Sequence, residues 1–312
     1  MRAFTAAAVQ LAPSSAPLTA ETVAENCRVA ADWVGRCAQA TGAELIVLPE
    51  TASTGFTPGT SPEALWDLVS EVPGPVTEPL QAAARAAGAH VVWGTYERGA
   101  ERGVVYNSAV LIGPDGAVLG TYRKTQPFCS EDVRRGGWVT PGDDVTVVDT
   151  DLGRIGMAIC FDGDFPELWR IQALQGAEVI VRPSALLRSA DIAELTSRAR
   201  AYDNHVYVVA ANATGTDPAG VHYFGNSHVV DPTSHTIARA ASHECWIAAR
   251  LDPDRAMASL TPGSSVPQSF DHLAERNLDV IRRYADVLQS PGSTSFPHGT
   301  PHSLRDEPSD RP

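Results

Sequence analysis

The sequence contains no long apolar run. No stretch of about 18 apolar residues occurs anywhere along its 312 residues, so a membrane-spanning helix is excluded. The first residues, MRAFTAAAVQL, carry one basic residue before a short apolar stretch. This stretch is too short for a signal peptide and is more typical of a first β-strand. We therefore expect a cytoplasmic protein.

Basic residues are also scarce. The chain has 24 Lys and Arg against 37 Asp and Glu, which gives a formal net charge of -13. Binding to nucleic acid or to an anionic membrane surface needs clustered Lys and Arg. The balance therefore excludes both as partners and favours a small molecule. Lysine is almost missing, because Lys124 is the only one, and a lysine can act as an acid or base in ways that arginine cannot.

The cysteines show no pairing pattern. Their number is odd, and no Cys-x-x-Cys spacing occurs among them: Cys27, Cys37, Cys129, Cys160 and Cys245. This disfavours both a disulfide framework and a zinc knuckle. We expect free thiols in a reducing compartment, with Cys160 as the exception that carries chemistry.

Apolar runs typical of strands alternate with amphipathic patterns typical of helices from residue 4 onward. Strands are expected at 4–13, 44–50, 90–97, 178–184 and 205–212, hairpins at 106–124 and 145–160, and three short strands within 224–252. Helices are expected at 19–40, 61–70, 76–87, 166–175, 191–204 and about 270–288. The pattern predicts one large layered α/β domain over residues 1–288. Residues 289–312 are rich in Pro, Ser and Gly, and we expect a disordered tail or an arm on a partner subunit.

Three ionisable residues end predicted strands. They are Glu50 after ELIVLP, Lys124 at the end of the first hairpin, and Cys160 at the end of the second. Open α/β sheets place their ligands at the carboxyl ends of strands. A carboxylate, an ammonium and a thiol together suit acyl transfer, in which the carboxylate takes the thiol proton, the thiolate attacks a carbonyl and the ammonium stabilises the oxyanion. The backbone N–H of Phe161 is a candidate second donor to that oxyanion.

Three segments resemble the signature blocks of the nitrilase, or carbon-nitrogen hydrolase, superfamily. They are ELIVLPE, GTYRKTQPF and GRIGMAICFDGDFPELWR, and their order and spacing also match. The resemblance implies a four-layer αββα sandwich, a Glu50-Lys124-Cys160 triad, no metal, no organic cofactor, and homo-oligomers built by packing sandwiches together. By the same resemblance, Glu50 is the general base, Lys124 the stabiliser of the oxyanion, and Cys160 the nucleophile.

The superfamily often adds a second glutamate in the loop after the lysine. Here that loop is TQPFCSEDVRRGGWVTPGD, and Glu131 is its only glutamate. The distance from Lys124 fits the amidase branch to within about a residue, so the neighbouring Asp132 stays an alternative.

The residues after the cysteine indicate the branch. CFDGDFPELWR is similar to the pattern of aliphatic amidases and formamidases, which implies hydrolysis of a small amide to a carboxylic acid and ammonia through a cysteine thioester. An N-carbamoyl amino acid hydrolase is an alternative, with Arg182, Arg134 or Arg135 as candidate ligands for a substrate carboxylate. A nitrilase activity on the same triad is another. A non-catalytic scaffold on this fold is disfavoured by the complete triad.

Overall fold

The computed structural model describes residues 1–12, 14, 16–187, 189–217, 219–253 and 271–289. The chain divides into two compact units, Met1–Asp271 and His272–Pro312, and the site lies in the first. No helix in the described ranges is both long and apolar enough to cross a membrane. The tail expected at 289–312 lies, except for Gln289, outside the described residues.

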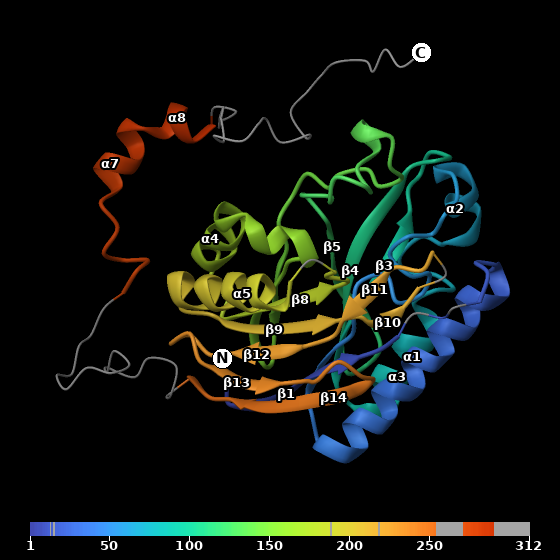
Figure 1. The fold of residues 1–312 in the computed structure, drawn as a ribbon. Helices are drawn as coiled ribbons and strands as arrows, with labels where there is room; N and C mark the ends of the chain where they lie inside the picture. Colours follow the sequence, from blue (N-terminus) through green and yellow to red (C-terminus); the bar gives the residue numbers. More distant parts are fainter. Residues whose placement is uncertain (13, 15, 188, 218, 254–270, 290–312) are drawn as a thin grey trace, which may run out of the picture. The chain divides into compact units, whose positions relative to one another are not determined.

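The first unit contains two large β-sheets, seen in Figure 1. One has the strand order β14-β1-β2-β3-β4-β5. The adjacent strands β1, β2 and β3 are parallel to one another, and the other neighbours pair antiparallel. The strands are β1 (Phe4–Gln10), β2 (Leu45–Val47), β3 (His90–Arg98), β4 (Val105–Ile112), β5 (Val118–Arg123) and β14 (Cys245–Leu251).

The second sheet repeats this plan with the order β13-β12-β9-β8-β7-β6. Again the inner strands β7, β8 and β9 are parallel. The strands are β6 (Val147–Thr150), β7 (Gly153–Met157), β8 (Val179–Ser184), β9 (Tyr207–Asn212), β12 (His228–Val230) and β13 (Thr236–Arg239). Strands β10 (Thr214–Thr216) and β11 (His222–Phe224) pair with each other and form a separate two-stranded sheet.

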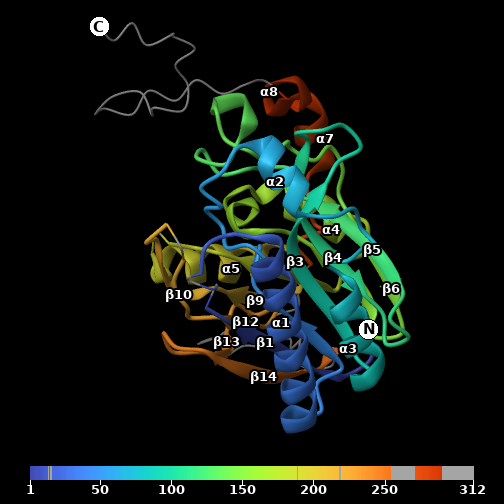
Figure 2. The same ribbon diagram turned by 90° about the vertical axis from the view of Figure 1, so that its right-hand side faces the viewer.

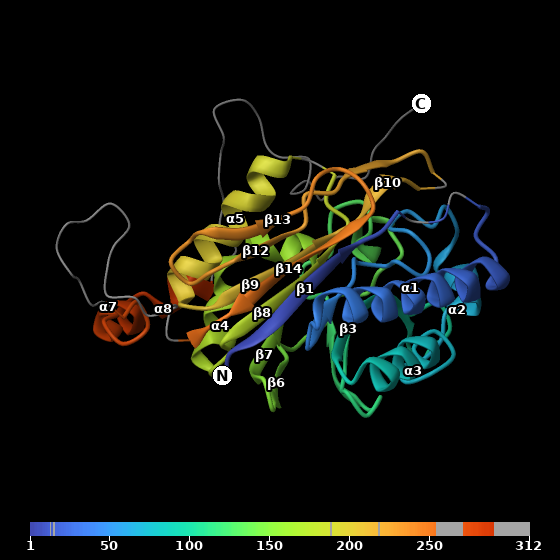
Figure 3. The ribbon, with the colours of Figure 1, turned by 90° about the horizontal axis from the view of Figure 1, so that it is seen from below.

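The helices cover the outer faces of the two sheets. Helices α1 (Ala20–Thr41) and α3 (Glu78–Ala87) pack on the first sheet, as Figure 2 shows, and α4 (Pro166–Leu174) and α5 (Ala190–Asn204) pack on the second. The sheets face each other, with β1 against β9 and β3 against β8. Seen from below, the four layers lie in the order helix, sheet, sheet, helix (Figure 3). The expected αββα sandwich is therefore confirmed.

The sequence explains why α1 forms where it does. Thr19 caps its first turn by accepting the N–H of Thr22, and Gly42 ends it in the left-handed conformation at φ +63°, which glycine adopts without strain. Its buried side chains recur every three or four residues and join the core beneath the helix: Val23, Cys27, Ala30, Val34 and Cys37. Cys27 and Cys37 are therefore core residues, and burial raises the pKa of each thiol.

Several predicted elements differ from the structure at their ends, and the strands expected at 4–13 and 44–50 end at Gln10 and Val47. The strand expected to end on Cys160 ends at Met157, because the Asp162 carboxylate accepts the N–H of Ile159 at 2.8 Å and turns the chain into the 3₁₀-helix η2 (Cys160–Asp164). The helix expected over about 270–288 begins later, as α7 (Leu278–Arg283) followed by α8 (Ala285–Gln289). Its start is fixed by Asn277, whose side chain accepts the N–H of Val280 and so caps α7. Residue 270 itself lies outside the described residues.

The remaining short elements lie in connections between the strands. Helix α2 (Pro62–Leu68) precedes α3, and the 3₁₀-helix η1 (Val133–Arg135) lies in the loop after Lys124.

Candidate active site

The structure brings the ends of four strands together between the two sheets. Glu50 follows β2 and Lys124 follows β5 in the first sheet, whereas Cys160 follows β7 in the second. Ala185, directly after β8, lies beside them and donates its backbone N–H to Oε2 of Glu50 at 2.7 Å. Each of these residues is nearly or fully buried. Ionisable groups that lie far apart in the sequence thus share one buried site.

Lys124 lies between two carboxylates. Its Nζ donates to Oε1 of Glu50 at 2.7 Å and to Oε1 of Glu131. The Lys124 and Glu131 side chains are 0% exposed, as is that of Glu50. Burial alone would lower the pKa of Lys124, but the attraction of Glu131 and Glu50 outweighs it and raises that pKa. Lys124 is therefore a cation.

Asn107 is a second donor to both carboxylates. From the middle of β4, its Nδ2 reaches Oε1 of Glu50 at 2.7 Å and Oε2 of Glu131 at 3.1 Å. Its backbone carbonyl also accepts the N–H of Lys124 at 2.8 Å. Sequence reasoning missed this residue, because a single polar residue in an apolar strand gives no signal of its own.

Glu131, and not Asp132, points at the lysine. Its Oε1 also accepts the N–H of Phe128 at 2.8 Å. Burial raises the pKa of Glu131, Lys124 lowers it, and the charge of Glu50 raises it, with a net rise. Asp132 instead accepts the guanidinium of Arg134 and caps η1. The alternative left open by the sequence is thus resolved in favour of Glu131 as the residue beside Lys124.

The backbone of Cys160 is held in an unusual conformation. Its φ is +46°, in the left-handed region, which costs a residue other than glycine about 1 to 3 kcal/mol. Arg182, on β8, supports this turn by donating Nε at 2.9 Å and Nη2 at 2.6 Å to the Cys160 carbonyl. Its Nη1 donates to Thr196 and Ser197 on α5. Arg182 is fully buried, so it supports the turn at Cys160 rather than facing a substrate.

Electrostatics keep the Cys160 thiol neutral at rest. Burial raises its pKa, and the charge of Glu50 raises it further, while Lys124 and Arg182 partly oppose this. A thiol in this setting needs a base at the moment of attack. Glu50 is the carboxylate whose charge acts on this thiol, which makes it the candidate for that base.

Asp162 ties the lysine segment to the cysteine turn. Its carboxylate accepts the hydroxyl of Tyr122 at 2.8 Å, the N–H of Gln126 at 3.1 Å and that of Ile159. Burial raises the pKa of Asp162 to about 6, although Lys124 and these hydrogen bonds oppose the rise. The two sheets therefore present Lys124 and Cys160 in a fixed relation.

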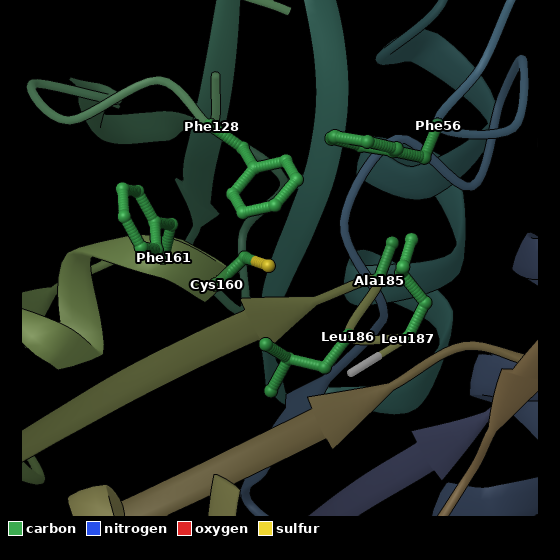
Figure 4. A pocket seen from close by; sticks show the side chains of 7 residues that line it. All are labelled: Phe56, Phe128, Cys160, Phe161, Ala185, Leu186 and Leu187. Carbon is green, nitrogen blue, oxygen red and sulfur yellow. The ribbon is translucent and has the colours of Figure 1, made fainter. Parts of the chain in front are cut away.

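A pocket opens at the cysteine. The space between atoms here, open solvent included, is about 270 Å³, and the pocket is lined by Phe56, Phe128, Cys160, Phe161, Ala185, Leu186 and Leu187. In Figure 4 the sulfur of Cys160 points into the space framed by Phe128, Phe56 and Leu186. The Phe161 side chain forms part of one wall, and its ring meets that of Phe128 edge to face at 5.2 Å. Sequence reasoning did not select Phe56 or Phe128, since both lie in loops.

Comparison with known proteins shows the family to which the chain belongs. The model of the carbon-nitrogen hydrolase family matches residues 5–258. A hydrolase of Pseudomonas protegens is 37% identical over 215 residues, covering 69% of this chain and 73% of that protein. The omega-amidase NIT2 of Homo sapiens is 31% identical over 262 residues, or 81% and 90% of the two chains. The crystal structure of an amidase from Nesterenkonia sp. has the same fold, with a TM-score of 0.72 over 90% of this chain and 96% of that one, at 23% identity.

The chain belongs to the carbon-nitrogen hydrolase family of the nitrilase superfamily. It is an enzyme of this family, and its amidase relatives support hydrolysis of an amide C–N bond.

Proposed function

We propose that the enzyme hydrolyses a small amide to a carboxylic acid and ammonia through a thioester on Cys160. The observation that carries the proposal is the position of Lys124, which donates to both Glu50 and Glu131 and acts electrostatically on the Cys160 thiol. A base, a fixed cation and a neutral thiol in one buried site are what acyl transfer requires.

In the first half-reaction, Glu50 takes the proton from Sγ of Cys160 as the sulfur attacks the amide carbonyl carbon. The negative charge that forms on the carbonyl oxygen is stabilised by the Lys124 ammonium, and the N–H of Phe161 stays the expected second donor. When the tetrahedral intermediate collapses, the C–N bond breaks and the nitrogen takes the proton from Glu50. Ammonia leaves, and the acyl group remains on sulfur.

The second half-reaction returns the enzyme to its starting state. Glu50 takes a proton from a water molecule, whose oxygen attacks the thioester carbonyl. The C–S bond then breaks, the carboxylic acid leaves, and the sulfur recovers its proton from Glu50. Glu131 acts as a positioning residue, because it and Asn107 hold Lys124 and Glu50 in place.

A protein of the same fold supports cysteine as the site of covalent chemistry. In a Glu-to-Gln variant of the Nesterenkonia sp. AN1 amidase, the acetamide moiety of fluoroacetamide is added covalently at the active-site cysteine. In this chain Cys160 lines the pocket, and its sulfur points into the space between the other lining side chains (Figure 4).

The N-carbamoyl amino acid alternative needs a cation for the substrate carboxylate. Of the three arginines considered for that role, Arg182 donates to the Cys160 carbonyl and Arg134 donates to the Asp132 carboxylate. Arg135 is exposed in η1. These placements favour a plain amide over a carbamoyl amino acid.

The test measures ammonia release from small amides, N-carbamoyl amino acids and nitriles by the wild type and by Cys160→Ala. Cys129→Ala is the matched control, because Cys129 is exposed. We expect Cys160→Ala to lose all measurable release and Cys129→Ala to keep it. Intact mass after acid quenching should show a wild-type adduct equal to the amide minus ammonia. Undiminished release by Cys160→Ala contradicts the proposal.

We also propose that the partner is a second copy of this chain. Helices α4 and α5 expose apolar side chains on the outer layer of the sandwich, among them Ile171, Leu174, Ile192 and Leu195. Packing sandwich on sandwich covers such a face, as expected from the family resemblance. Leu195→Glu should shift the sedimentation coefficient toward that of a monomer, whereas Ile237→Glu, at an exposed position on β13, should not. A wild type that sediments as a monomer contradicts this proposal.

A further inference from the structure

The wall of the pocket is apolar. Apart from Cys160, every described residue that lines it carries a hydrocarbon side chain. Three are phenylalanines, one from each catalytic segment: Phe56 follows the Glu50 loop, Phe128 follows Lys124, and Phe161 follows Cys160. The space left between them is thus suited to hydrocarbon rather than to hydrogen-bonding groups.

These walls are fixed in place by the catalytic network. The N–H of Phe128 donates to Glu131, and the Phe56 ring lies 5.5 Å from Nζ of Lys124. The Phe56 carbonyl accepts the hydroxyl of Tyr96 at 2.7 Å. A pocket whose walls are already ordered costs little to fill, since no side chain has to be immobilised on binding.

The Leu186 side of the pocket is held by hydrogen bonds to its main chain. The side chain of Asn212, at the end of β9, accepts the N–H of Leu186 at 2.7 Å and donates to the Leu186 carbonyl at 3.3 Å. It also donates to the carbonyl of Gly225 at 2.8 Å. The main chain that carries Leu186 and Leu187 is therefore anchored by a buried amide on a neighbouring strand.

The charges around the pocket disfavour an anionic acyl group. Glu50 and Glu131 place two carboxylates beside the single ammonium of Lys124. Arg182 is bound to the Cys160 carbonyl. A substrate carboxylate entering this pocket would lose its water and come near two carboxylates, and the described residues that line the pocket include no basic side chain to bind it, which is unfavourable.

Resting on the proposed amidase function, we propose that the acyl group of the substrate occupies the pocket formed by Phe56, Phe128, Phe161, Leu186 and Leu187. The enzyme therefore selects amides of uncharged, apolar carboxylic acids larger than acetic acid. Each added methylene moves from water to hydrocarbon as the acyl chain grows, and this raises kcat/KM until the pocket is full.

The first test compares substrates of matched length. We expect kcat/KM for ammonia release to rise at least tenfold from acetamide to pentanamide. We expect kcat/KM for pentanamide to be at least tenfold higher than that for 5-amino-5-oxopentanoate, which carries a carboxylate in place of the terminal methyl group. The value for the neutral diamide of the same length should lie between the two. Equal or better turnover of the carboxylate, or a fall from acetamide to pentanamide, overturns the proposal. Arg188, which follows Leu187 and lies outside the described residues, is then changed to Ala to test whether it recruits the carboxylate.

The second test changes the wall. Leu187 is 38% exposed at the pocket and Leu119 is 40% exposed on β5, so Leu187→Gln and Leu119→Gln are matched. We expect Leu187→Gln to lower the ratio of pentanamide to acetamide turnover at least threefold, and Leu119→Gln to leave the ratio unchanged. Leu186→Ala, which shortens the neighbouring wall, should also lower it. If both wall variants keep the wild-type ratio, the acyl group binds elsewhere.

The two levels of failure are distinguishable. If no amide gives ammonia release that depends on Cys160, the proposed function fails. If release depends on Cys160 but shows no preference for apolar acyl groups, only the inference about the pocket fails.

Discussion

Asn107 and Lys124 donate to the same oxygen, Oε1 of Glu50, each at 2.7 Å. Asn107 lies on β4 and Lys124 directly follows the adjacent strand β5, and the Lys124 N–H donates to the Asn107 carbonyl. The other oxygen, Oε2, accepts the N–H of Ala185. The carboxylate assigned as base is therefore held at both oxygens by donors from two sheets, which fixes its direction before a substrate arrives.

Asn107→Leu should lower kcat/KM by about ten- to a hundredfold. The change keeps the side-chain size but removes a donor to two carboxylates, and a hydrogen bond to a charged group contributes about 1.5 to 3 kcal/mol. Burial already raises the pKa of Glu131, and the loss of the Asn107 donor raises it further, so the acidic limb of the pH–rate profile should move to higher pH. Steady-state kinetics from about pH 4 to about pH 9 measure both effects.

The matched control for Asn107 is Asn204→Leu. Asn204 is also buried, and in both residues Oδ1 has no hydrogen-bond partner within the described chain, but Asn204 lies at the end of α5. The Asn204→Leu variant should therefore keep the wild-type pH–rate profile. Equal losses in both variants would mean that Asn107 matters for folding rather than for Glu50.

Arg182→Lys should slow the reaction of Cys160. The guanidinium holds the Cys160 carbonyl with two nitrogens, whereas an ammonium is a point charge that cannot reproduce the fork. The left-handed turn at Cys160 would then relax. We expect about a tenfold fall in kcat with little change in KM, and a similar fall in the rate of alkylation by iodoacetamide. Arg182→Gln should be worse than Arg182→Lys.

The control is Arg134→Lys, at an exposed arginine paired with Asp132. Its alkylation rate should equal that of the wild type. If Arg182→Lys melts at a lower temperature but alkylates at the wild-type rate, Arg182 is structural only.

Gly94→Ala should displace the base. A Cβ at position 94 would lie 2.4 Å from the Pro49 carbonyl oxygen and 2.7 Å from Cα of Glu50, so the backbone has to move. We expect a loss of at least a hundredfold in kcat/KM, because a shift of about 1 Å in a catalytic group has an effect of this size. Gly35→Ala, in α1 with nothing within 4 Å, should keep full activity and gain up to about 1 kcal/mol in stability. Full activity in Gly94→Ala would contradict the assigned position of Glu50.

The sequence indicated much of the fold and the three polar strand ends. Apolar runs such as LIV and VIVRPS are buried on both faces, as parallel strands covered by helices must be. Three ionisable residues stood out because each ends a predicted strand: Glu50, Lys124 and Cys160. Glu131 was reached through resemblance, and its contact with Lys124 separates it from Asp132.

Other parts of the site depend on contacts that the sequence pattern does not encode. Asn107 and Glu50 are separated by 57 positions, and they meet only because β2 pairs with β3 and β3 pairs with β4. Arg182 is a lone charge in an apolar strand, which the sequence suggested as a ligand for a carboxylate. The structure shows that it binds a backbone carbonyl. The left-handed φ of Cys160 follows from this tertiary support and not from local propensity.

His228 should make the protein less stable in mild acid. It is buried on β12, its Nδ1 pairs with the carbonyl of Asn226, and its Nε2 has no partner within the described residues. Burial lowers its pKa to about 4; Arg182 and Arg239 also lower it, whereas the Asn226 carbonyl and Glu194 oppose the fall.

As the pH falls below about 6.5, this histidine is protonated in the unfolded chain but stays neutral in the folded chain. The free energy of unfolding therefore falls by up to about 1.4 kcal/mol per pH unit until about pH 4. His228→Phe should show a smaller loss in the urea midpoint between about pH 7 and about pH 5 than the wild type. His235→Phe, at an exposed histidine, should match the wild type. An unchanged loss in His228→Phe would show that His228 does not set this part of the acid sensitivity.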